Sequence, residues 1–266
     1  MGSKFTIVAG VLVAVLGGGV PAREAAFAPA AGRPGGIQDG ARAVDRVPYD
    51  GRFVFARLRY GSDGLHSIRW RVPPWAHDYP DAEANLMRIV EAITCLRPYV
   101  GERGGNIFDL DDPELFRFPV AYMAEPGYWT MTPEQATSLR RYLLKGGFLI
   151  VDDFRGPHWD NFARQMERVL PEHQLIEIDG AHPVFRSFFE IPDPLAFVPP
   201  YGHDLQPRFF GIFEENDPRA RLMVIANYNN DIGDYWEHSA SSFLPIDRSN
   251  DAYKFGVNYL IYGLTH

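Results

Sequence analysis

One stretch, residues 146–156, constrains the fold of this chain more than any other. It begins with two glycines, which are followed by a short apolar run at residues 148–151 and then by two adjacent carboxylates, Asp152 and Asp153. An apolar run of this length between glycines and polar residues is typical of a central strand covered on both faces. In open α/β sheets, ligands bind at the carboxyl ends of the strands. The stretch therefore predicts a fold class and a candidate site at its polar end.

The sequence on either side of this strand predicts flanking helices. Thr132, Pro133 and Gln135 form a capping box that begins a helix, and Gly146 is suited to end it in the left-handed conformation. A second helical pattern follows at residues 162–170. A strand between two such helices is the crossover arrangement of a parallel sheet.

The remaining apolar patterns complete an α/β domain over residues 51–266. Further strands are predicted at residues 53–60, 119–124, 175–178, 209–213 and 222–226, and further helices at residues 80–97, 184–189 and 251–262. The last two strands flank the turn Asn216-Asp217-Pro218, which predicts a β-hairpin. We therefore expect a mostly parallel central sheet with a C-terminal hairpin.

Composition and charge limit the classes of function. The chain has 266 residues, 46% of them hydrophobic, which is enough for the core of one large domain. Its formal net charge of -8 argues against a nucleic-acid partner, because such partners are bound mainly through basic side chains. Cys95 is the single cysteine, so no intramolecular disulfide can form. It falls in a predicted helix, where an inert side chain packed in the core is expected.

The N-terminus has the pattern of a secretory signal peptide. Lys4 precedes an apolar run, and Val-Pro-Ala at residues 20–22 is a small-residue cleavage site, so residues 1–22 are predicted to be removed on export. The alternative is a retained anchor, which would then be the contact with a membrane. Residues 23–50 are rich in Ala, Gly, Pro and Arg and are predicted to form a disordered linker. We therefore expect a periplasmic or secreted domain.

Polar residues after the central strand form the first part of a candidate binding set. Adjacent residues of an extended strand point to opposite faces, so one of Asp152 and Asp153 is expected to face a cleft. The alternative is that both are structural, so that one caps the following helix while the other pairs with a nearby arginine. Arg155 and His158 follow in the next loop and join the set. A carboxylate facing the cleft has the chemistry to bind a metal ion, a sugar hydroxyl or an arginine.

Loops after other predicted strands carry further candidates. His182 lies in a tight turn before a proline, where it either bonds to the backbone or acts as a ligand or acid–base group. Asp231 shares a polar loop with Asp234 and His238. Together with His158 and Asp152, these are the residue types of an oxygen and nitrogen metal site. No metal-ligand spacing is present, so neither a metal nor another cofactor is assigned. If the strands are parallel neighbours, His182 and Asp231 converge with Asp152 at one edge of the sheet.

Trp75 and Asp78 complete the candidate set. With His77 between them, they form either an aromatic and polar platform for a sugar or the packed start of a helix. The sequence contains no Gly-x-Ser-x-Gly elbow, phosphate loop or Rossmann glycine pattern.

Several of these segments resemble a bacterial family called "domain of unknown function 4159". The resemblance covers residues 52–264 and rests on the run 132–154 with Asp152-Asp153, on Trp75, Asp78 and Pro80, on the His182-Pro183 turn, and on the helix with Asn258. It implies a three-layer, flavodoxin-like fold of the class I glutamine-amidotransferase type. It also implies export or membrane attachment, as is common in the family, and no established activity.

A more distant similarity is to trehalose-utilisation-type proteins of the same fold group, carried by residues 132–148. Where those proteins tend to carry histidine after the strand, this chain has Asp152. Thiol-dependent glutamine amidotransferases need a thiolate at this strand tip, and the chain has no cysteine there. We therefore do not expect cysteine-dependent amidotransferase activity.

Two functions from different classes fit the sequence. The first is a non-catalytic exported domain that binds a small molecule, a carbohydrate or an envelope protein, and the lack of a complete catalytic set favours it. The second is a hydrolase with carboxylate and histidine groups, metal-assisted or not, acting on a carbohydrate or cell-envelope substrate. A deep cluster of Asp152, His182 and Asp231 would favour the hydrolase, and a dispersed arrangement would favour the binding domain.

Cleavage near Ala22 is the first testable prediction. Intact-mass analysis of the exported protein should give a species that begins after Ala22, because the apolar run is short for a membrane span and ends at small residues. A species that keeps Met1 and stays in the membrane fraction would show that the segment is an anchor.

Overall fold

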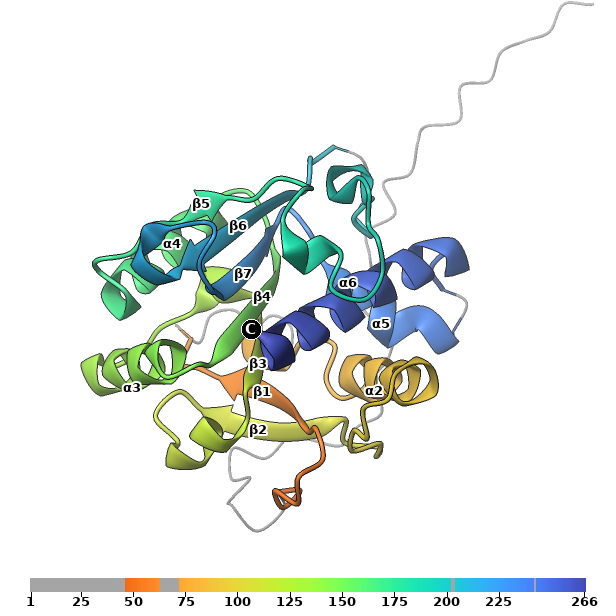
Figure 1. Ribbon diagram of the computed structural model, residues 1–266, viewed down its shortest axis with the longest axis horizontal. Helices are drawn as coiled ribbons and strands as arrows, with labels where there is room; N and C mark the ends of the chain where they lie inside the picture. The colour runs from red at the N-terminus through yellow and green to blue at the C-terminus, as the bar shows by residue number, and fades with distance from the viewer. Residues whose placement is uncertain (1–45, 63–71, 202–203, 242) are drawn as a thin grey trace, which may run out of the picture. The chain divides into compact units, whose positions relative to one another are not determined.

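The computed structural model describes residues 46–62, 72–201, 204–241 and 243–266. The predicted signal peptide and most of the predicted linker lie outside these described residues. Seven strands form one sheet in the order β2-β1-β3-β4-β7-β6-β5 (Figure 1). The strands are β1 (Phe55–Arg59), β2 (Gly105–Asp109), β3 (Val120–Ala124), β4 (Phe148–Phe154), β5 (Ile176–Glu177), β6 (Arg208–Phe213) and β7 (Leu222–Tyr228).

Helices cover both faces of the sheet. They are α2 (Asp81–Ile93), α3 (Pro133–Leu144), α4 (His158–Val169), α5 (Ile232–Glu237) and α6 (Ile246–Thr265). In Figure 1, α3 and α4 lie on one side of the sheet, whereas α2, α5 and α6 lie on the other. Short 3-10 turns connect these elements, namely η2 (Pro74–Ala76), η3 (Pro113–Arg117), η4 (Pro126–Tyr128), η5 (Pro183–Phe185), η6 (Pro194–Ala196), η7 (Glu214–Asn216) and η8 (His238–Ala240).

The pairing of the strands confirms the predicted fold class. Strand β1 pairs in parallel with β2 and β3, and β4 pairs in parallel with β3 and β7. Strand β6 is antiparallel to both β7 and β5, so β6 and β7 form the predicted C-terminal hairpin. The result is a three-layer, flavodoxin-like α/β domain with a mostly parallel sheet.

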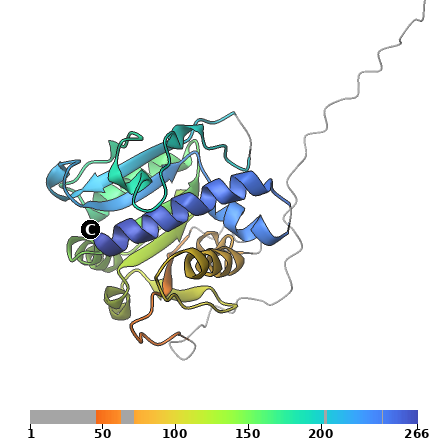
Figure 2. The same cartoon turned by 45° about the vertical axis from the view of Figure 1, so that its right-hand side comes forward.

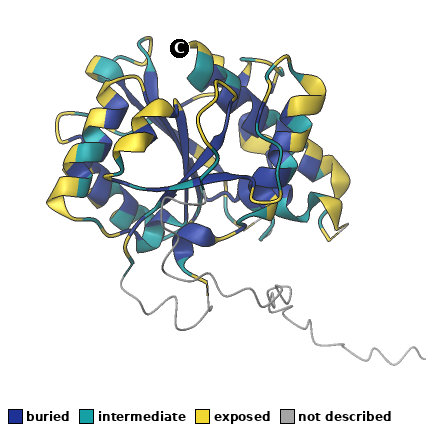
Figure 3. Cartoon of the chain, turned by 90° about the horizontal axis from the view of Figure 1, so that it is seen from below, coloured by how far each residue is buried: buried dark blue, intermediate teal, exposed yellow. Residues whose placement is uncertain are grey.

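Strand β4 lies at the centre of the sheet, as its apolar run predicted. Phe148 and Ile150 pack on the α2–α6 side, whereas Leu149 and Val151 pack on the α3–α4 side, and all four are buried. Figure 3 shows the strands buried and the outer faces of the helices exposed. Burial of each such side chain contributes roughly 1.5–3 kcal/mol. The position of β4 fixes where Asp152 and Asp153 leave the sheet.

The capping box of α3 forms as predicted. The backbone N–H of Gln135 donates to Oγ1 of Thr132 at 3.2 Å, and Oε1 of Gln135 accepts from the backbone N–H of Thr132 at 3.1 Å. Gly146 follows the helix with φ of +108°, a conformation that glycine adopts without a steric penalty. These two ends set the direction in which the chain enters β4.

Helix α6 crosses one face of the sheet (Figure 2). Gly263 allows a close approach, because a Cβ atom there would lie 2.7 Å from the ring of Phe148 and 2.8 Å from a methyl group of Val120. The helix begins at Ile246, five residues before the predicted start. Within the described part of the chain, no helix combines the length and the apolar character needed to span a bilayer.

The structure corrects the prediction for Cys95. Helix α2 ends at Ile93, because Thr94 is extended and its hydroxyl donates to the carbonyl oxygen of Val90 at 2.7 Å. Thr94 Oγ1 also accepts from the backbone N–H of Leu96 at 3.1 Å, which fixes a turn. Cys95 therefore lies in this turn and is exposed instead of packed in the core.

Candidate functional site

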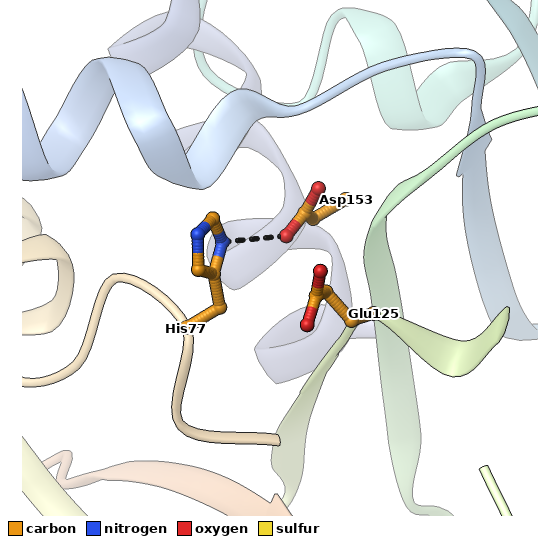
Figure 4. Close-up of side chains that lie close together, drawn as sticks. All are labelled: His77, Glu125 and Asp153. Atoms are coloured by element: carbon orange, nitrogen blue, oxygen red, sulfur yellow. Dashed lines mark hydrogen bonds and ion pairs between the residues drawn. The ribbon is translucent and has the colours of Figure 1, made fainter. Parts of the chain in front are cut away.

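The ends of three neighbouring parallel strands bring acidic side chains together. Asp153 lies near the end of β4, Glu125 follows β3, and Asp231 follows β7. Because these strands are parallel, their carboxyl ends share one edge of the sheet. The loop between η2 and α2 adds His77 and Asp78 to the same place. In Figure 4, His77, Glu125 and Asp153 converge from three separate segments.

Asp152 is the structural member of the carboxylate pair. Its buried carboxylate accepts hydrogen bonds from the backbone N–H groups of Ile232 and Gly233, both at 2.8 Å, in the first turn of α5. The Tyr122 hydroxyl and the Asn227 amide donate to it as well, at 3.1 Å and 3.0 Å. Burial raises the pKa of Asp152 to about 6, against the opposing effect of these hydrogen bonds. Asp152 thus caps a helix.

Asp153 faces the site instead. Its φ of +58° coincides with a register shift between β4 and β7. Such a bulge redirects a side chain that strict alternation would place on the other face. Its Oδ2 atom lies 2.7 Å from Nδ1 of His77. Exposure of the Asp153 side chain is 13% and that of His77 is 45%, so His77 forms the solvent boundary of the site.

His77 and Asp153 form an ion pair. The negative charge of Asp78 raises the pKa of His77 to about 12, burial opposes this effect, and the charge of Asp153 adds to it. For Asp153, burial favours the neutral form, but the attraction of His77 outweighs burial and the pKa is lowered. His77 therefore carries a positive charge beside the carboxylates of the acidic cluster.

Asp78 is a buried carboxylate without a hydrogen-bond partner. Neither of its oxygens accepts a hydrogen bond from the described residues, and its side chain is fully buried. Oδ1 lies 3.1 Å from Nδ1 of His77, which bonds to Asp153. Burial raises the pKa of Asp78 well above its usual value. Gly233 makes room for it, because a Cβ atom there would lie 2.6 Å from Oδ2 of Asp78.

Asp231 and Glu125 complete the acidic cluster. Asp231 is buried and caps α5, where its Oδ1 accepts from the backbone N–H of Asp234 at 3.0 Å. Burial and then the charge of Asp153 raise the pKa of Asp231 well above its usual value. The same two causes raise the pKa of Glu125 to about 8. Burial therefore favours the protonated form of both carboxyl groups more than it does in an ordinary, exposed carboxyl group.

Three groups of side chains have the spacing of metal-ligand sets. Within each group, the ligand atoms all lie within 4.8 Å of one another. The groups are His77, Glu125 and Asp153; Asp78, Asp153 and Asp231; and Asp234, Glu237 and His238. The second set offers only oxygen ligands, which suit Mg²⁺, Ca²⁺ or Mn²⁺, whereas the other two add an imidazole.

A buried ion pair holds the loop that carries His77. The guanidinium of Arg57 on β1 pairs with the carboxylate of Glu83 on α2, and both side chains are almost fully buried. Arg57 Nη1 also donates to the carbonyl oxygens of Trp75 and His77, at 3.0 Å and 2.8 Å. The guanidinium lies 4.9 Å from the centre of the Tyr122 ring. Arg57 therefore fixes the backbone on which His77 and Asp78 stand.

Arg155 and His158 border the cluster without joining it. Arg155 is exposed, and its guanidinium lies 4.2 Å from the centre of the Tyr201 ring. His158 begins α4, its ring packs on Tyr128 at 4.8 Å, and burial lowers its pKa. Neither residue contributes to the ligand sets described above.

Two predicted site residues lie elsewhere. His182 does not converge with Asp152, because its ring packs against Phe213 and Tyr262, and Phe213 pairs with the first residue of β7 at the opposite edge of the sheet. Trp75 is buried in the core on the α3–α4 side and offers no exposed ring to a sugar. Its backbone carbonyl, which Arg57 holds, is its contribution to the site.

The edge of the sheet near His182 contains a surface cavity of about 560 Å³. His182, Arg221, Tyr262 and His266 are among the residues that line it. Among the described residues, no side chain lining this cavity leaves a buried polar atom without a partner. The acidic cluster at the other edge is therefore the candidate site, because the buried oxygens of Asp78 accept no hydrogen bond from the described residues.

Sequence reasoning missed Glu125 and did not include His77 in the binding set. Glu125 directly follows the buried strand β3, the same position that singled out Asp152 after β4. His77 lay between two chosen residues, but only the fold brings it within 2.7 Å of Asp153.

Comparison with known proteins gives a family. A family model described as "Domain of unknown function (DUF4159)" matches residues 54–264, which is most of the chain. The chain belongs to this family. The match confirms the resemblance inferred from the sequence, and the similarity of this DUF4159 domain to trehalose-utilisation-type proteins stays a prediction. No curated protein matches the chain.

Arg57 gives a stability prediction for the DUF4159 domain. Arg57→Met should lower the free energy of unfolding by about 3–5 kcal/mol, because it leaves the Glu83 carboxylate buried without its partner. Urea unfolding followed by tryptophan fluorescence measures this change. The matched control is Arg219→Met, since Arg219 is 90% exposed in its pair with Asp217 and such pairs contribute about 0–1 kcal/mol. If the two variants lower the free energy of unfolding by the same amount, the pair of Arg57 and Glu83 does not stabilise the fold as a buried ion pair.

The raised pKa values predict that stability falls with rising pH. In the native state, Glu125 keeps its proton up to about pH 8, and Asp152 and Asp234 keep theirs up to about pH 6. In the unfolded chain, the same carboxyl groups lose their protons at lower pH. A raised native pKa contributes stability at low pH that is lost as pH rises through the native pKa. With a chelator present, unfolding should therefore cost at least about 2 kcal/mol less at about pH 8 than at about pH 5.5. Stability that is constant or rises over this range would show that these carboxyl groups ionise normally.

Proposed function

We propose that this DUF4159 domain is a ligand-binding module whose ligand at the acidic cluster is a divalent metal cation. The observation that carries the proposal is Asp78, a fully buried carboxylate without a hydrogen-bond partner among the described residues. Its Oδ1 atom lies 3.1 Å from Nδ1 of His77, which also bonds to Asp153, so two carboxylates share one imidazole. A buried ionised carboxylate is costly unless its charge is compensated, and a bound cation would supply that compensation. Its ligand atom lies within 4.8 Å of those of Asp153 and Asp231, the spacing of a shared cation.

The charge balance of the cluster supports a cation as the ligand. Asp78, Asp153, Asp231 and Glu125 face one another across short distances, and His77 is the cationic side chain in the two ligand sets they form. Burial raises the pKa values of three of these four carboxyl groups, so they bind protons more readily than ordinary carboxyl groups do, and a bound cation would favour their charged forms instead. Metal binding would release those protons, because metal ligands must be deprotonated.

A metal-assisted hydrolase acting on a carbohydrate or cell-envelope substrate is the second candidate. His77 at the solvent boundary and Glu125, with a pKa of about 8, favour it, since acid–base catalysts work best with pKa values near the operating pH. Cation-dependent turnover of peptidoglycan fragments or glycosides, lost in His77→Gln, separates this candidate from a binding module. We also propose export to the periplasm or the medium, supported by the pattern of residues 1–22.

The proposed function predicts that Mn²⁺ stabilises the protein. At roughly 100 times its Kd, Mn²⁺ should raise the unfolding temperature by about 5–10 °C, because it binds the folded state only. Asp78→Asn should weaken binding at least about tenfold while leaving the metal-free protein as stable or more stable. Asparagine accepts the φ of +63° at this position and has no charge to bury. Calorimetric titration and thermal unfolding give the two values.

The control is Glu167→Gln on α4, an exposed carboxylate that belongs to none of the three ligand sets, and this variant should bind Mn²⁺ like the natural protein. If Asp78→Asn lowers the stability of the metal-free protein without changing the affinity for Mn²⁺, Asp78 is a structural group and the proposed site is wrong.

A further inference from the structure

Asp153 belongs to two ligand sets at once. One set is Asp78, Asp153 and Asp231, and the other is His77, Glu125 and Asp153. We propose that each set holds one divalent cation and that the Asp153 carboxylate bridges the two ions. This inference rests on the proposed function and specifies how many ions the site takes and how they are joined.

The position of Asp153 suits a bridging ligand. The bulge in β4 places its carboxylate between the His77 ring, 2.7 Å from Oδ2, and the buried pair Asp78 and Asp231. Asp78 points toward both sets, since its Oδ1 lies 3.1 Å from His77 Nδ1 and neither of its oxygens has a hydrogen-bond partner among the described residues. Two-metal sites hold their ions about 3.5–4 Å apart, a separation that one carboxylate spans.

The two sets differ in chemistry and in access to solvent. Asp78 and Asp231 are buried, so their set offers an enclosed, all-oxygen position for a hard cation. The set with His77 is open to solvent and adds a nitrogen ligand, so its ion keeps positions for water or for an oxyanion. Mn²⁺ suits both donor sets, and it is therefore the probe for the pair.

Charge also favours two ions over one. The two sets together contain four carboxylates, on Asp78, Glu125, Asp153 and Asp231, and four positive charges balance them. A single divalent cation leaves two of these charges unbalanced. A protonated His77 neutralises one of the two, so one negative charge stays unbalanced in a largely buried place. A second cation takes the place of the proton that His77 Nδ1 shares with Asp153.

The experiment measures Mn²⁺ stoichiometry and the coupling between ions in the full chain. Equilibrium dialysis should give two ions per chain, and electron paramagnetic resonance should show the exchange-coupled spectrum of a bridged pair. Glu125→Gln and Asp231→Asn should each leave one ion with the spectrum of an isolated centre. Asp153→Asn should weaken the binding of both ions at least about tenfold. Glu167→Gln, on the exposed face of α4, is the matched control and should keep two coupled ions.

Other outcomes overturn the inference in distinguishable ways. One ion per natural chain, lost in Asp78→Asn, rejects the bridged pair and leaves the proposed function intact. Two ions without coupling, the second lost in Glu237→Gln and not in Glu125→Gln, would place that ion in the set of Asp234, Glu237 and His238. No bound Mn²⁺ rejects the proposed function together with the pair. The spectrum of the natural protein decides the matter even where a variant fails to fold.

Discussion

The buried ion pair between Arg57 and Glu83 is the interaction on which the site depends. It joins β1 to α2, and Nη1 of Arg57 donates to the backbone carbonyls of Trp75 and His77. A buried charge pair is a weak source of net stability, but breaking it is costly, so it selects one arrangement of the groups it joins. Here the selected arrangement places His77 and Asp78 opposite the carboxyl ends of the parallel strands.

Backbone conformation adds a second constraint. Asp78, Glu125 and Asp153 all have positive φ, at +63°, +45° and +58°, and all three carry carboxylates of the cluster. Left-handed conformations of residues other than glycine cost on the order of 1 kcal/mol or more and collect at functional sites. The surrounding sheet and the Arg57 anchor maintain these conformations. Acidic side chains that repel one another thus converge on one point. This arrangement favours a positively charged ligand, because its attraction to the carboxylates would offset their mutual repulsion.

The sequence predicted the parts of the structure that depend on local patterns. The apolar run of β4, the capping box at Thr132 and the hairpin of β6 and β7 each follow from neighbouring residues. The bulge that turns Asp153 does not, because it arises from the pairing of β4 with β7. His182 was misplaced because β5 has only two residues, and the chain then packs against the far end of β6.

The adjacent carboxylates Asp152 and Asp153 divide two tasks that the sequence assigned to them jointly. Asp152 binds the first turn of α5 through two backbone N–H groups, and this fixes Asp231, the residue that begins the helix. Asp231 then lies beside Asp153, while Gly233 in the same turn leaves space for Asp78. The buried carboxylate of Asp152 therefore fixes the positions of the other carboxylates of the cluster through the first turn of α5. The two adjacent carboxylates therefore have different physical roles, since Asp152 anchors a helix and Asp153 faces the acidic cluster, although the two residues are covalent neighbours.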